Sequence, residues 1–203
     1  MNNMPAYLKH LSADKKLQKI LSTAEPLALT RRKNIYLYLC ASIMSQQLST
    51  KVAEVIYNRF LALYGKKKPT TQQILDTPFE TLRSIGLSNA KANYVQNVCR
   101  FFIEEKLTDS RLYKMTDEEV LGKLTQIKGV GKWTTEMILM FALQHEDVFP
   151  ADDLGIQQAM MKLYKIQADT KKELHDKMHR IAEKWRPYRT YACMHLWRWK
   201  DNA

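Results

Sequence analysis

Residues that make tight turns are scarce in this chain, which contains six glycines and six prolines among 203 residues. Sheet sandwiches and barrels reverse direction often and need many such residues. Apolar residues instead recur at helical spacing along most of the chain, and no segment alternates as a half-buried strand does. The sequence therefore predicts an all-α fold of about ten helices.

A polar segment interrupts the longest helical pattern. Apolar residues follow helical spacing over residues 31–64, but Ser45-Gln46-Gln47-Leu48-Ser49-Thr50 breaks the pattern, and a serine or threonine there can cap a second helix. We therefore expect two helices joined at a bend, and we refer to Gln46–Leu48 as the elbow. Upstream, the spacing of leucines and isoleucines predicts one helix over residues 8–22.

The charge balance is strongly basic, with 32 Lys and Arg against 21 Asp and Glu and a net charge of +11. Such a charge favours a polyanionic partner, namely nucleic acid, an anionic membrane or an acidic protein. A basic surface that serves only solubility is the alternative, which charge alone leaves open. No apolar run approaches the roughly 18 residues of a membrane span. Since the N-terminus also lacks a signal-peptide pattern, we expect a soluble cytoplasmic protein.

The three cysteines, Cys40, Cys99 and Cys193, are far apart in sequence and form no Cys-x-x-Cys pair. A disulfide framework, a zinc ribbon and a four-cysteine iron–sulfur cluster are therefore not expected. Free thiols in a reducing compartment are the simpler interpretation.

Two of the six glycines, Gly129 and Gly131, stand two residues apart between two helical patterns. Glycine permits the positive φ and the close backbone approach of a tight helix-to-helix turn. The free N–H groups of a helix beginning at Lys132 can bind a phosphate, with Lys128 and Lys132 on either side. Contacts of this kind bind DNA without regard to base sequence. The alternative is a purely structural hairpin whose lysines are solvated.

The hairpin and four further blocks resemble the helix-hairpin-helix DNA base-excision glycosylases. Residues 124–134 fit the pattern L-x-x-I-x-G-V-G-x-x-T of that superfamily. The other blocks are Ile43-Met44-Ser45-Gln46-Gln47-Leu48-Ser49, Gly86-Leu87-Ser88-x-x-Lys91-Ala92, Val148-Phe149-Pro150-Ala151-Asp152-Asp153-Leu154-Gly155-Ile156, and residues 183–192 followed by His195-Leu196-Trp197. The last block is similar to the C-terminal signature of the AlkA-like branch, 3-methyladenine DNA glycosylase II. That branch often carries an N-terminal β domain, which the segment before the first block is too short to hold, so a minimal, all-helical member is implied.

The resemblance also implies an architecture and an activity. Residues 36–145 would form a helical barrel-like subdomain that ends in the hairpin, and residues 1–35 plus 146–203 a second helical subdomain, with the active cleft between them. The implied enzyme is monofunctional: it flips a damaged base out of duplex DNA and hydrolyses the N-glycosidic bond, which leaves an abasic site. The implied substrates are alkylated purines of the 3-methyladenine and 7-methylguanine type, and relatives act as monomers.

Asp153, the second residue of the Asp152-Asp153 pair, takes the catalytic role in this resemblance. A carboxylate beside the sugar can stabilise oxocarbenium character and can orient or deprotonate the attacking water. Asp153 is expected at the start of a helix from Leu154, where the helix dipole favours negative charge. Simple N-capping is the usual role of such a pair, and we assign the cap to Asp152.

Trp133 is informative because bifunctional relatives, which also cut the strand, carry a lysine at that position. The amine of that lysine forms a Schiff base with the sugar, so no AP lyase activity is expected here. Trp133 and Trp197 are the implied stacking residues of the base pocket, since electron-rich rings attract a cationic alkylated purine. Met137 stands where the best-known members have a tyrosine, which leaves the lesion range open.

The remaining expectations concern DNA contacts and an ion. The implied DNA-binding residues are those of the hairpin: Lys128, Gly129, Val130, Gly131, Lys132 and Thr134. Gln47, or as second choice Leu48, is expected to fill the gap left by the flipped nucleotide, unless the elbow residues only cap or pack the bend. The carbonyl groups of Thr125, Ile127 and Gly129 are the implied ligands of a monovalent cation, Na⁺ or K⁺, and no other cofactor is required.

Two other functions stay open at this point. A helix-hairpin-helix glycosylase for another lesion, such as uracil, a mismatch or an oxidised base, is compatible with Met137. A non-enzymatic hairpin protein that only binds DNA is the other alternative, although pure binding needs neither a carboxylate at Asp153 nor the tryptophan pair.

Overall fold

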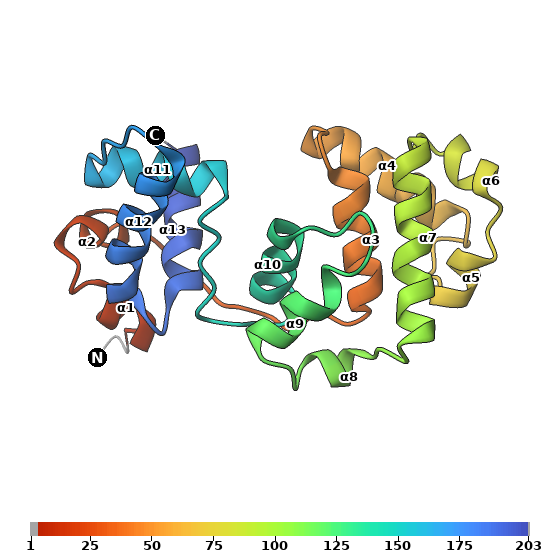
Figure 1. The fold of residues 1–203 in the computed structure, drawn as a ribbon, viewed down its shortest axis with the longest axis horizontal. Coiled ribbons are helices and arrows are strands. Elements are labelled where there is room, and N and C mark those ends of the chain that lie inside the picture. The colour runs from red at the N-terminus through yellow and green to blue at the C-terminus, as the bar shows by residue number, and fades with distance from the viewer. Residues whose placement is uncertain (1–3, 203) are drawn as a thin grey trace. The chain divides into compact units, whose positions relative to one another are not determined.

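A computed structural model describes residues 4–202 of the chain. Within these residues the fold consists of thirteen α-helices and one 3₁₀-helix, with no strand (Figure 1). The predicted all-α class is therefore confirmed. None of the described helices is long and apolar enough to cross a membrane.

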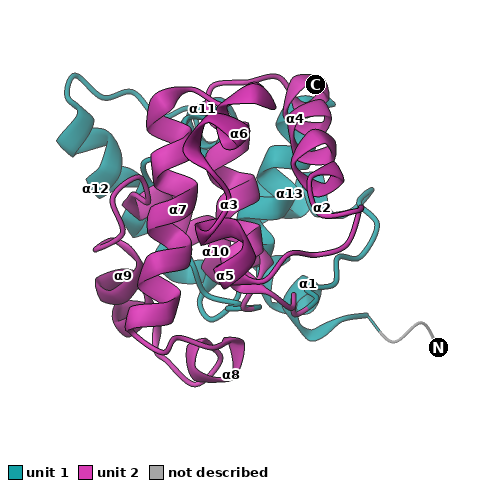
Figure 2. Ribbon diagram, turned by 90° about the vertical axis from the view of Figure 1, so that its right-hand side faces the viewer, with its two compact units in different colours: residues 1–30, 144–203 teal, residues 31–143 magenta. Residues whose placement is uncertain are grey.

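The described residues form two compact units, which Figure 2 colours separately. Unit 2 is the continuous segment 31–143, and unit 1 combines the residues up to 30 with those from 144 onward. The family resemblance implied a division at residues 36 and 145. Residues 31–35 belong to unit 2, where the Asp109 carboxylate accepts hydrogen bonds from the backbone N–H groups of Asn34 and Ile35, at 2.7 and 3.0 Å.

Unit 2 is built around the packing of α3 (Ile35–Ser45) against α7 (Asn89–Glu104). Leu39, Ile43 and Val95 on these two helices are fully buried. The other helices are α4 (Thr50–Ala62), α5 (Thr71–Leu75), α6 (Phe79–Ser84), α8 (Asp109–Leu112), α9 (Asp117–Leu124) and α10 (Lys132–Phe141). Helices α5 and α6 pack on α7, α4 and α10 pack on α3, and α9 packs on α10. The helix pair α9–α10 is thereby anchored to the core of the unit.

Unit 1 is centred on α11 (Leu154–Tyr164) and α13 (Arg189–Asp201), and α2 (Lys15–Leu21) packs on both. Its remaining helices are α1 (Ala6–Leu11), α12 (Lys171–Ala182) and the 3₁₀-helix η1 (Glu183–Trp185). Trp185 is completely buried, and its ring lies 6.0 Å from that of Phe149 and 6.1 Å from that of Tyr164. Aromatic packing of this kind dominates the core of a small unit.

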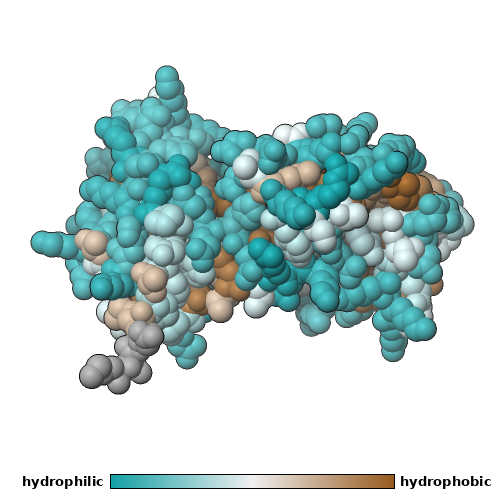
Figure 3. Space-filling view, turned by 90° about the horizontal axis from the view of Figure 1, so that it is seen from below, coloured by the Kyte–Doolittle hydropathy of each residue, from teal (hydrophilic) through white to brown (hydrophobic). Residues whose placement is uncertain are grey.

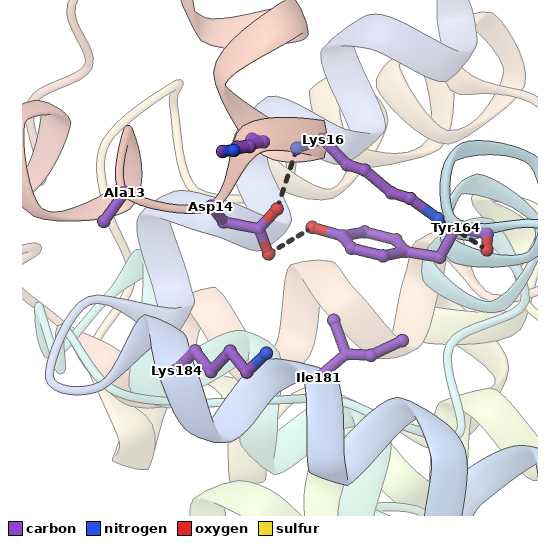
Figure 4. Close-up of a pocket in the computed structure, with 7 residues that line it drawn as sticks. Ala13, Asp14, Lys16, Tyr164, Ile181 and Lys184 are labelled. Atoms are coloured by element: carbon purple, nitrogen blue, oxygen red, sulfur yellow. Dashed lines mark hydrogen bonds between the residues drawn. The ribbon is translucent and has the colours of Figure 1, made fainter.

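The expectation of one helix over residues 8–22 is wrong, because the chain breaks into α1 and α2 at Asp14. One carboxylate oxygen of Asp14 caps α2 by accepting two backbone N–H groups of its first turn. The other oxygen accepts the Tyr164 hydroxyl at 2.8 Å and the Trp185 indole N–H at 3.2 Å. Figure 4 shows Asp14 and Tyr164 joined by this hydrogen bond in the lining of a pocket. These partners are distant in sequence, so local spacing could not reveal the break.

The predicted bend after residue 45 is confirmed. Helix α3 ends at Ser45 and α4 begins at Thr50, and the Ser49 hydroxyl caps α4 by accepting the Val52 N–H. Hydrophilic residues predominate on the face shown in Figure 3, as the basic composition leads one to expect.

Candidate active site and nucleic-acid interface

Asp153 is the N-cap of α11, and its carboxylate has a fixed orientation. Its Oδ1 atom accepts the Ile156 backbone N–H at 2.8 Å and the Trp197 indole N–H at 2.8 Å. One donor belongs to the first turn of α11 and the other to α13. Two helices that pack together therefore fix the orientation of this carboxylate. The predicted position at the start of a helix is confirmed.

The assignment of the cap to Asp152 is wrong. The helical hydrogen-bond ladder of α11 begins at the Asp153 carbonyl, which accepts the Gln157 N–H at 2.9 Å, so Asp153 holds the capping register. Asp152 is exposed and forms an ion pair with Lys171, whose Nζ lies 2.8 Å from its Oδ1. One residue, Asp153, therefore combines the cap with the proposed chemistry.

Trp197 has a contact that the sequence did not reveal. It was expected to stack on a base, and the structure shows its indole nitrogen bonded to the carboxylate of Asp153. The indole N–H lies in the plane of the ring, so this hydrogen bond does not itself occupy a ring face. Trp197 is half-buried.

Gly155 is a site residue that the sequence analysis missed. A Cβ atom added there would lie 3.0 Å from Asp153 Oδ1 and 3.0 Å from both Nε1 and Cδ1 of Trp197. A side chain at this position would crowd these atoms, which would have to shift by a few tenths of an ångström. A glycine in the first turn of a helix lowers helix propensity, and that unfavourable choice was the signal available in the sequence.

Leu154, also missed, is unusually exposed for an apolar residue. It begins α11 directly after Asp153, and 71% of its surface is accessible. It therefore supplies apolar surface immediately beside the carboxylate.

The two glycines of the hairpin between α9 and α10 have different surroundings. Gly129 has φ +103°, and an added Cβ would lie 2.2 Å from Cγ of Tyr94 on α7, so no side chain fits. Gly131 is the N-cap of α10 with an extended backbone, and an added Cβ would meet nothing within 4 Å. Positive φ is thus required at Gly129, whereas the surroundings of Gly131 within the described residues are open.

The other hairpin residues predicted to contact DNA form two groups, one exposed and one buried. Lys128 and Lys132 are exposed, and Lys132 Nζ lies 3.6 Å from Glu136 Oε1. Val130 and Thr134 are buried, each 4% exposed, so only their backbone can reach a ligand. No side chain caps the start of α10. This leaves a helix N-terminus flanked by lysines, as expected for phosphate binding.

The elbow lies against the hairpin in unit 2. The Gln46 side-chain amide donates a long hydrogen bond, 3.4 Å, to the Gly129 carbonyl. Gln47 is exposed and has φ +57°, in the left-handed region, and Leu48 is 37% exposed. Both predicted wedge side chains therefore project from a bend that touches the hairpin.

Trp133 and Met137 lie one turn apart on α10 but have different surroundings. Trp133 is 43% exposed. Met137 is half-buried and lines a groove of about 520 Å³ together with Tyr38, Tyr57 and Phe141, and Trp133 is not among the lining residues. The three cysteines are buried, and none of them forms a disulfide among the described residues.

Comparison with known proteins decides the family. Residues 40–187 match the family described as HhH-GPD superfamily base excision DNA repair protein. The chain belongs to the HhH-GPD superfamily.

Several HhH-GPD relatives are similar over nearly the whole chain. "DNA-3-methyladenine glycosylase 1" of Schizosaccharomyces pombe is 34% identical, over 91% of this chain and 80% of that protein. The crystal structure of the Bacillus halodurans DNA-3-methyladenine glycosidase superposes with a TM-score of 0.85 at 32% identity, covering 98% of this chain and 91% of that one. The S. pombe 3-methyladenine DNA glycosylase in complex with abasic DNA gives a TM-score of 0.81 at 33% identity, covering 96% of both chains.

The predicted site residues of this HhH-GPD protein fall into two groups. Asp153 and Trp197 are in direct contact within unit 1. The hairpin and the elbow are in contact within unit 2, which also carries Trp133 and Met137. A single pocket formed from both groups stays a prediction.

Proposed function

We propose that this protein is a monofunctional DNA glycosylase that removes alkylated purines of the 3-methyladenine and 7-methylguanine type and leaves an abasic site. The observation that carries the proposal is the Asp153 carboxylate, oriented by both α11 and Trp197. Membership of a base-excision repair family and the names of the relatives support the same activity.

Asp153 supplies the chemistry of the proposed reaction. As the N-glycosidic bond lengthens, positive charge develops on the sugar, and a fixed carboxylate stabilises that charge without having to reorganise. The same group orients or deprotonates the water that attacks the sugar carbon. The two hydrogen bonds to Oδ1 keep the carboxylate in one orientation throughout the reaction.

The proposed partner is duplex DNA with a damaged base, and the hairpin is proposed to bind its phosphate backbone. The uncapped start of α10 and the exposed Lys128 suit one phosphate group. The open surroundings of Gly131 would admit the DNA backbone closely. The net charge of +11 adds attraction that is independent of base sequence.

The proposed base pocket uses Trp133 and Trp197. A purine alkylated at N3 or N7 is cationic, and a cation above an electron-rich ring gains about 0.5–2 kcal/mol. Met137 is softer and less polar than the tyrosine of the best-known members. Another lesion therefore stays the alternative, and the identity of the released base separates the two.

The absence of strand cleavage is part of the proposal. A lyase needs an amine that attacks the sugar and forms a Schiff base. The position that carries this lysine in bifunctional relatives is Trp133, and the neighbouring Lys132 extends toward Glu136. The product is therefore an abasic site in an uncut strand.

The carbonyl groups of Thr125, Ile127 and Gly129 are proposed ligands of Na⁺ or K⁺. Ile127 O accepts the Val130 N–H at 2.9 Å and Gly129 O accepts the Gln46 amide at 3.4 Å, and each carbonyl oxygen has a second lone pair. Neutral carbonyl oxygens suit a monovalent cation, which when bound would add positive charge beside a DNA phosphate. No iron–sulfur cluster or other cofactor is proposed, and the protein is proposed to act as a cytoplasmic monomer.

Single-turnover release of bases from methylated duplex DNA tests the proposal. The wild type should release 3-methyladenine or 7-methylguanine, and the strand should break only after alkali. Asp153→Asn should lower the rate by about 100-fold or more. Asparagine is an equally good N-cap, and its amide oxygen can accept the same two hydrogen bonds, so the fold is retained.

The outcomes of this experiment are distinct. Base release by Asp153→Asn at the wild-type rate would remove the carboxylate from the mechanism. Release of a neutral damaged base alone would favour another lesion. Salt-sensitive DNA binding without any release would favour a protein that only binds DNA.

A further inference from the structure

The segment Gly86-Leu87-Ser88-x-x-Lys91-Ala92 has no part in the proposed chemistry, yet its lysine occupies an unusual position. The Ser88 hydroxyl caps α7 by accepting the Lys91 backbone N–H at 3.3 Å. This places Lys91 in the first turn of the helix. A positive charge in the first turn interacts unfavourably with the helix dipole. A contact elsewhere must therefore stabilise the ammonium group of Lys91.

That contact is made with the end of another helix. Lys91 Nζ donates to the Met44 carbonyl at 3.0 Å and to the Gln46 carbonyl at 2.6 Å. These oxygens belong to the last turn of α3 and to the residue that follows it. A helix C-terminus carries partial negative charge and unpaired carbonyl groups, which one ammonium group satisfies here. Lys91 is half-buried, and this burial lowers the pKa of its ammonium group.

The two bonds are formed immediately before the elbow. Gln47 has φ +57°, a conformation that is disfavoured for a residue with a side chain. The Gln46 carbonyl held by Lys91 belongs to the peptide that joins Gln46 to Gln47, and the Gln46 amide contacts the hairpin at Gly129. The ammonium group thus holds the chain at the point where it turns toward Gln47 and Leu48.

We propose that Lys91 is a positioning residue for base flipping: it holds the elbow so that Gln47 and Leu48 are presented to the DNA beside the hairpin. The inference rests on the proposed function, because it assigns the elbow the wedge role in that reaction. It predicts that loss of the ammonium group impairs eversion of the base more than it impairs folding or binding of undamaged DNA.

Lys91→Met tests the proposal, because methionine keeps the apolar stem and removes the ammonium group. Lys16→Met is the matched control: Lys16 Nζ also donates to a carbonyl, that of Tyr164 at 3.0 Å, but in unit 1. Eversion is followed by the fluorescence of 2-aminopurine next to the lesion, in an Asp153→Asn background that slows excision. Lys91→Arg, which can donate to the same carbonyls, serves as the conservative variant.

The expected result is a smaller fluorescence rise for Lys91→Met and a fall of about 10- to 100-fold in its single-turnover excision rate. Lys16→Met should behave as wild type in both assays, and Lys91→Arg should recover part of the rate. A double-mutant cycle with the Gln47→Ala/Leu48→Ala pair should be non-additive, because Lys91 acts through those side chains.

A purely structural role gives a different pattern. Wild-type fluorescence and excision in folded Lys91→Met, or rate losses that add fully with those of the elbow pair, would overturn the proposal. Failure of the proposed function is seen separately, because the wild type would then release no base. The fluorescence comparison does not need excision, so it tests Lys91 wherever the wild type itself gives a fluorescence rise.

Discussion

Asp153 combines two roles that are usually separate in a helical protein. It caps α11 and it is aimed by Trp197, and both contacts use the same oxygen atom. The sequence indicated the acidic pair and the helix start, but not which aspartate holds the cap. Capping register depends on where the helical hydrogen bonds begin, and neighbouring residues of the same type cannot be distinguished by spacing.

Gly155→Ala is predicted to impair chemistry without impairing folding. The added methyl group would lie 3.0 Å from Asp153 Oδ1 and from Trp197 Nε1, so the carboxylate must turn or the indole must withdraw. Alanine favours a helix over glycine by about 1 kcal/mol, which offsets the strain in stability. We expect the single-turnover rate to fall about tenfold or more, with little change in the urea unfolding midpoint.

Gly122→Ala is the matched control for that variant. Gly122 lies within α9, and an added Cβ would meet nothing within 4 Å. It should gain about 0.5–1 kcal/mol in stability and keep the wild-type rate. Equal rates for both variants would mean that the Asp153–Trp197 contact does not matter for catalysis.

At the scale of elements, local signals predicted helix ends well where the capping partner is near in sequence. Ser49 caps α4, as the sequence suggested for a serine or threonine in that segment. At α9 the cap is equally local, since Thr116 and Glu119 form a capping box. The break at Asp14 was missed because Tyr164 and Trp185 support it from far along the chain. Long-range contacts of this kind leave no periodicity to detect.

Replacement of the two hairpin glycines by alanine is predicted to have different effects, mainly on stability at Gly129 and mainly on DNA affinity at Gly131. Gly129→Ala should lose about 3 kcal/mol or more of stability, because the methyl group overlaps the Tyr94 ring at a positive φ. Gly131→Ala has space and should lose no more than about 1 kcal/mol as a poorer N-cap. Its affinity for undamaged duplex DNA should nevertheless fall, since the added group occupies the proposed path of the DNA backbone.

Urea unfolding and fluorescence anisotropy with labelled duplex measure the two effects separately. Wild-type affinity in Gly131→Ala would show that the DNA does not approach this glycine closely. A stable, active Gly129→Ala would contradict the packing against Tyr94.

At the scale of the whole molecule, the all-α class was predictable because helical periodicity covers most of the chain. The division into two units was anticipated only from the family resemblance, since no linker composition marks it. The backbone N–H groups of the segment 31–35 donate to the Ala142 carbonyl and the Asp109 carboxylate, contacts within unit 2 that only folding creates.

The stability of the molecule should depend on pH through His195. This side chain is 2% exposed, and neither ring nitrogen has a hydrogen-bond partner among the described residues. Burial, with the nearby charge of Arg198, lowers the pKa of His195 to about 4. The unfolded chain therefore binds a proton near pH 6.5 that the folded chain binds only near pH 4. Above pH 6.5 His195 is neutral in both states, and the free energy of unfolding has its full value. As the pH falls from 6.5 toward 4, protonation favours the unfolded chain, and the free energy of unfolding decreases by up to about 3 kcal/mol.

Urea unfolding of wild type and His195→Leu between pH 7 and pH 4 checks this expectation. Leucine keeps an apolar side chain in the buried site and cannot titrate, so the variant should lose less stability on acidification. Parallel pH profiles would show that His195 does not contribute to acid sensitivity.

The discontinuous chain path of unit 1 imposes an order of events during synthesis. Unit 2 is one uninterrupted segment, so all its residues have emerged from the ribosome soon after Leu143 is made. Helices α1 and α2 are made before unit 2, whereas α11 and α13, against which α2 packs, are made after it. Leu17 and Leu21 of α2 are buried in the folded protein. They have no such partners while more than half of the chain is still being translated. During synthesis this apolar segment lacks its packing partners, and transiently exposed apolar surface of this kind makes a folding chain prone to aggregation.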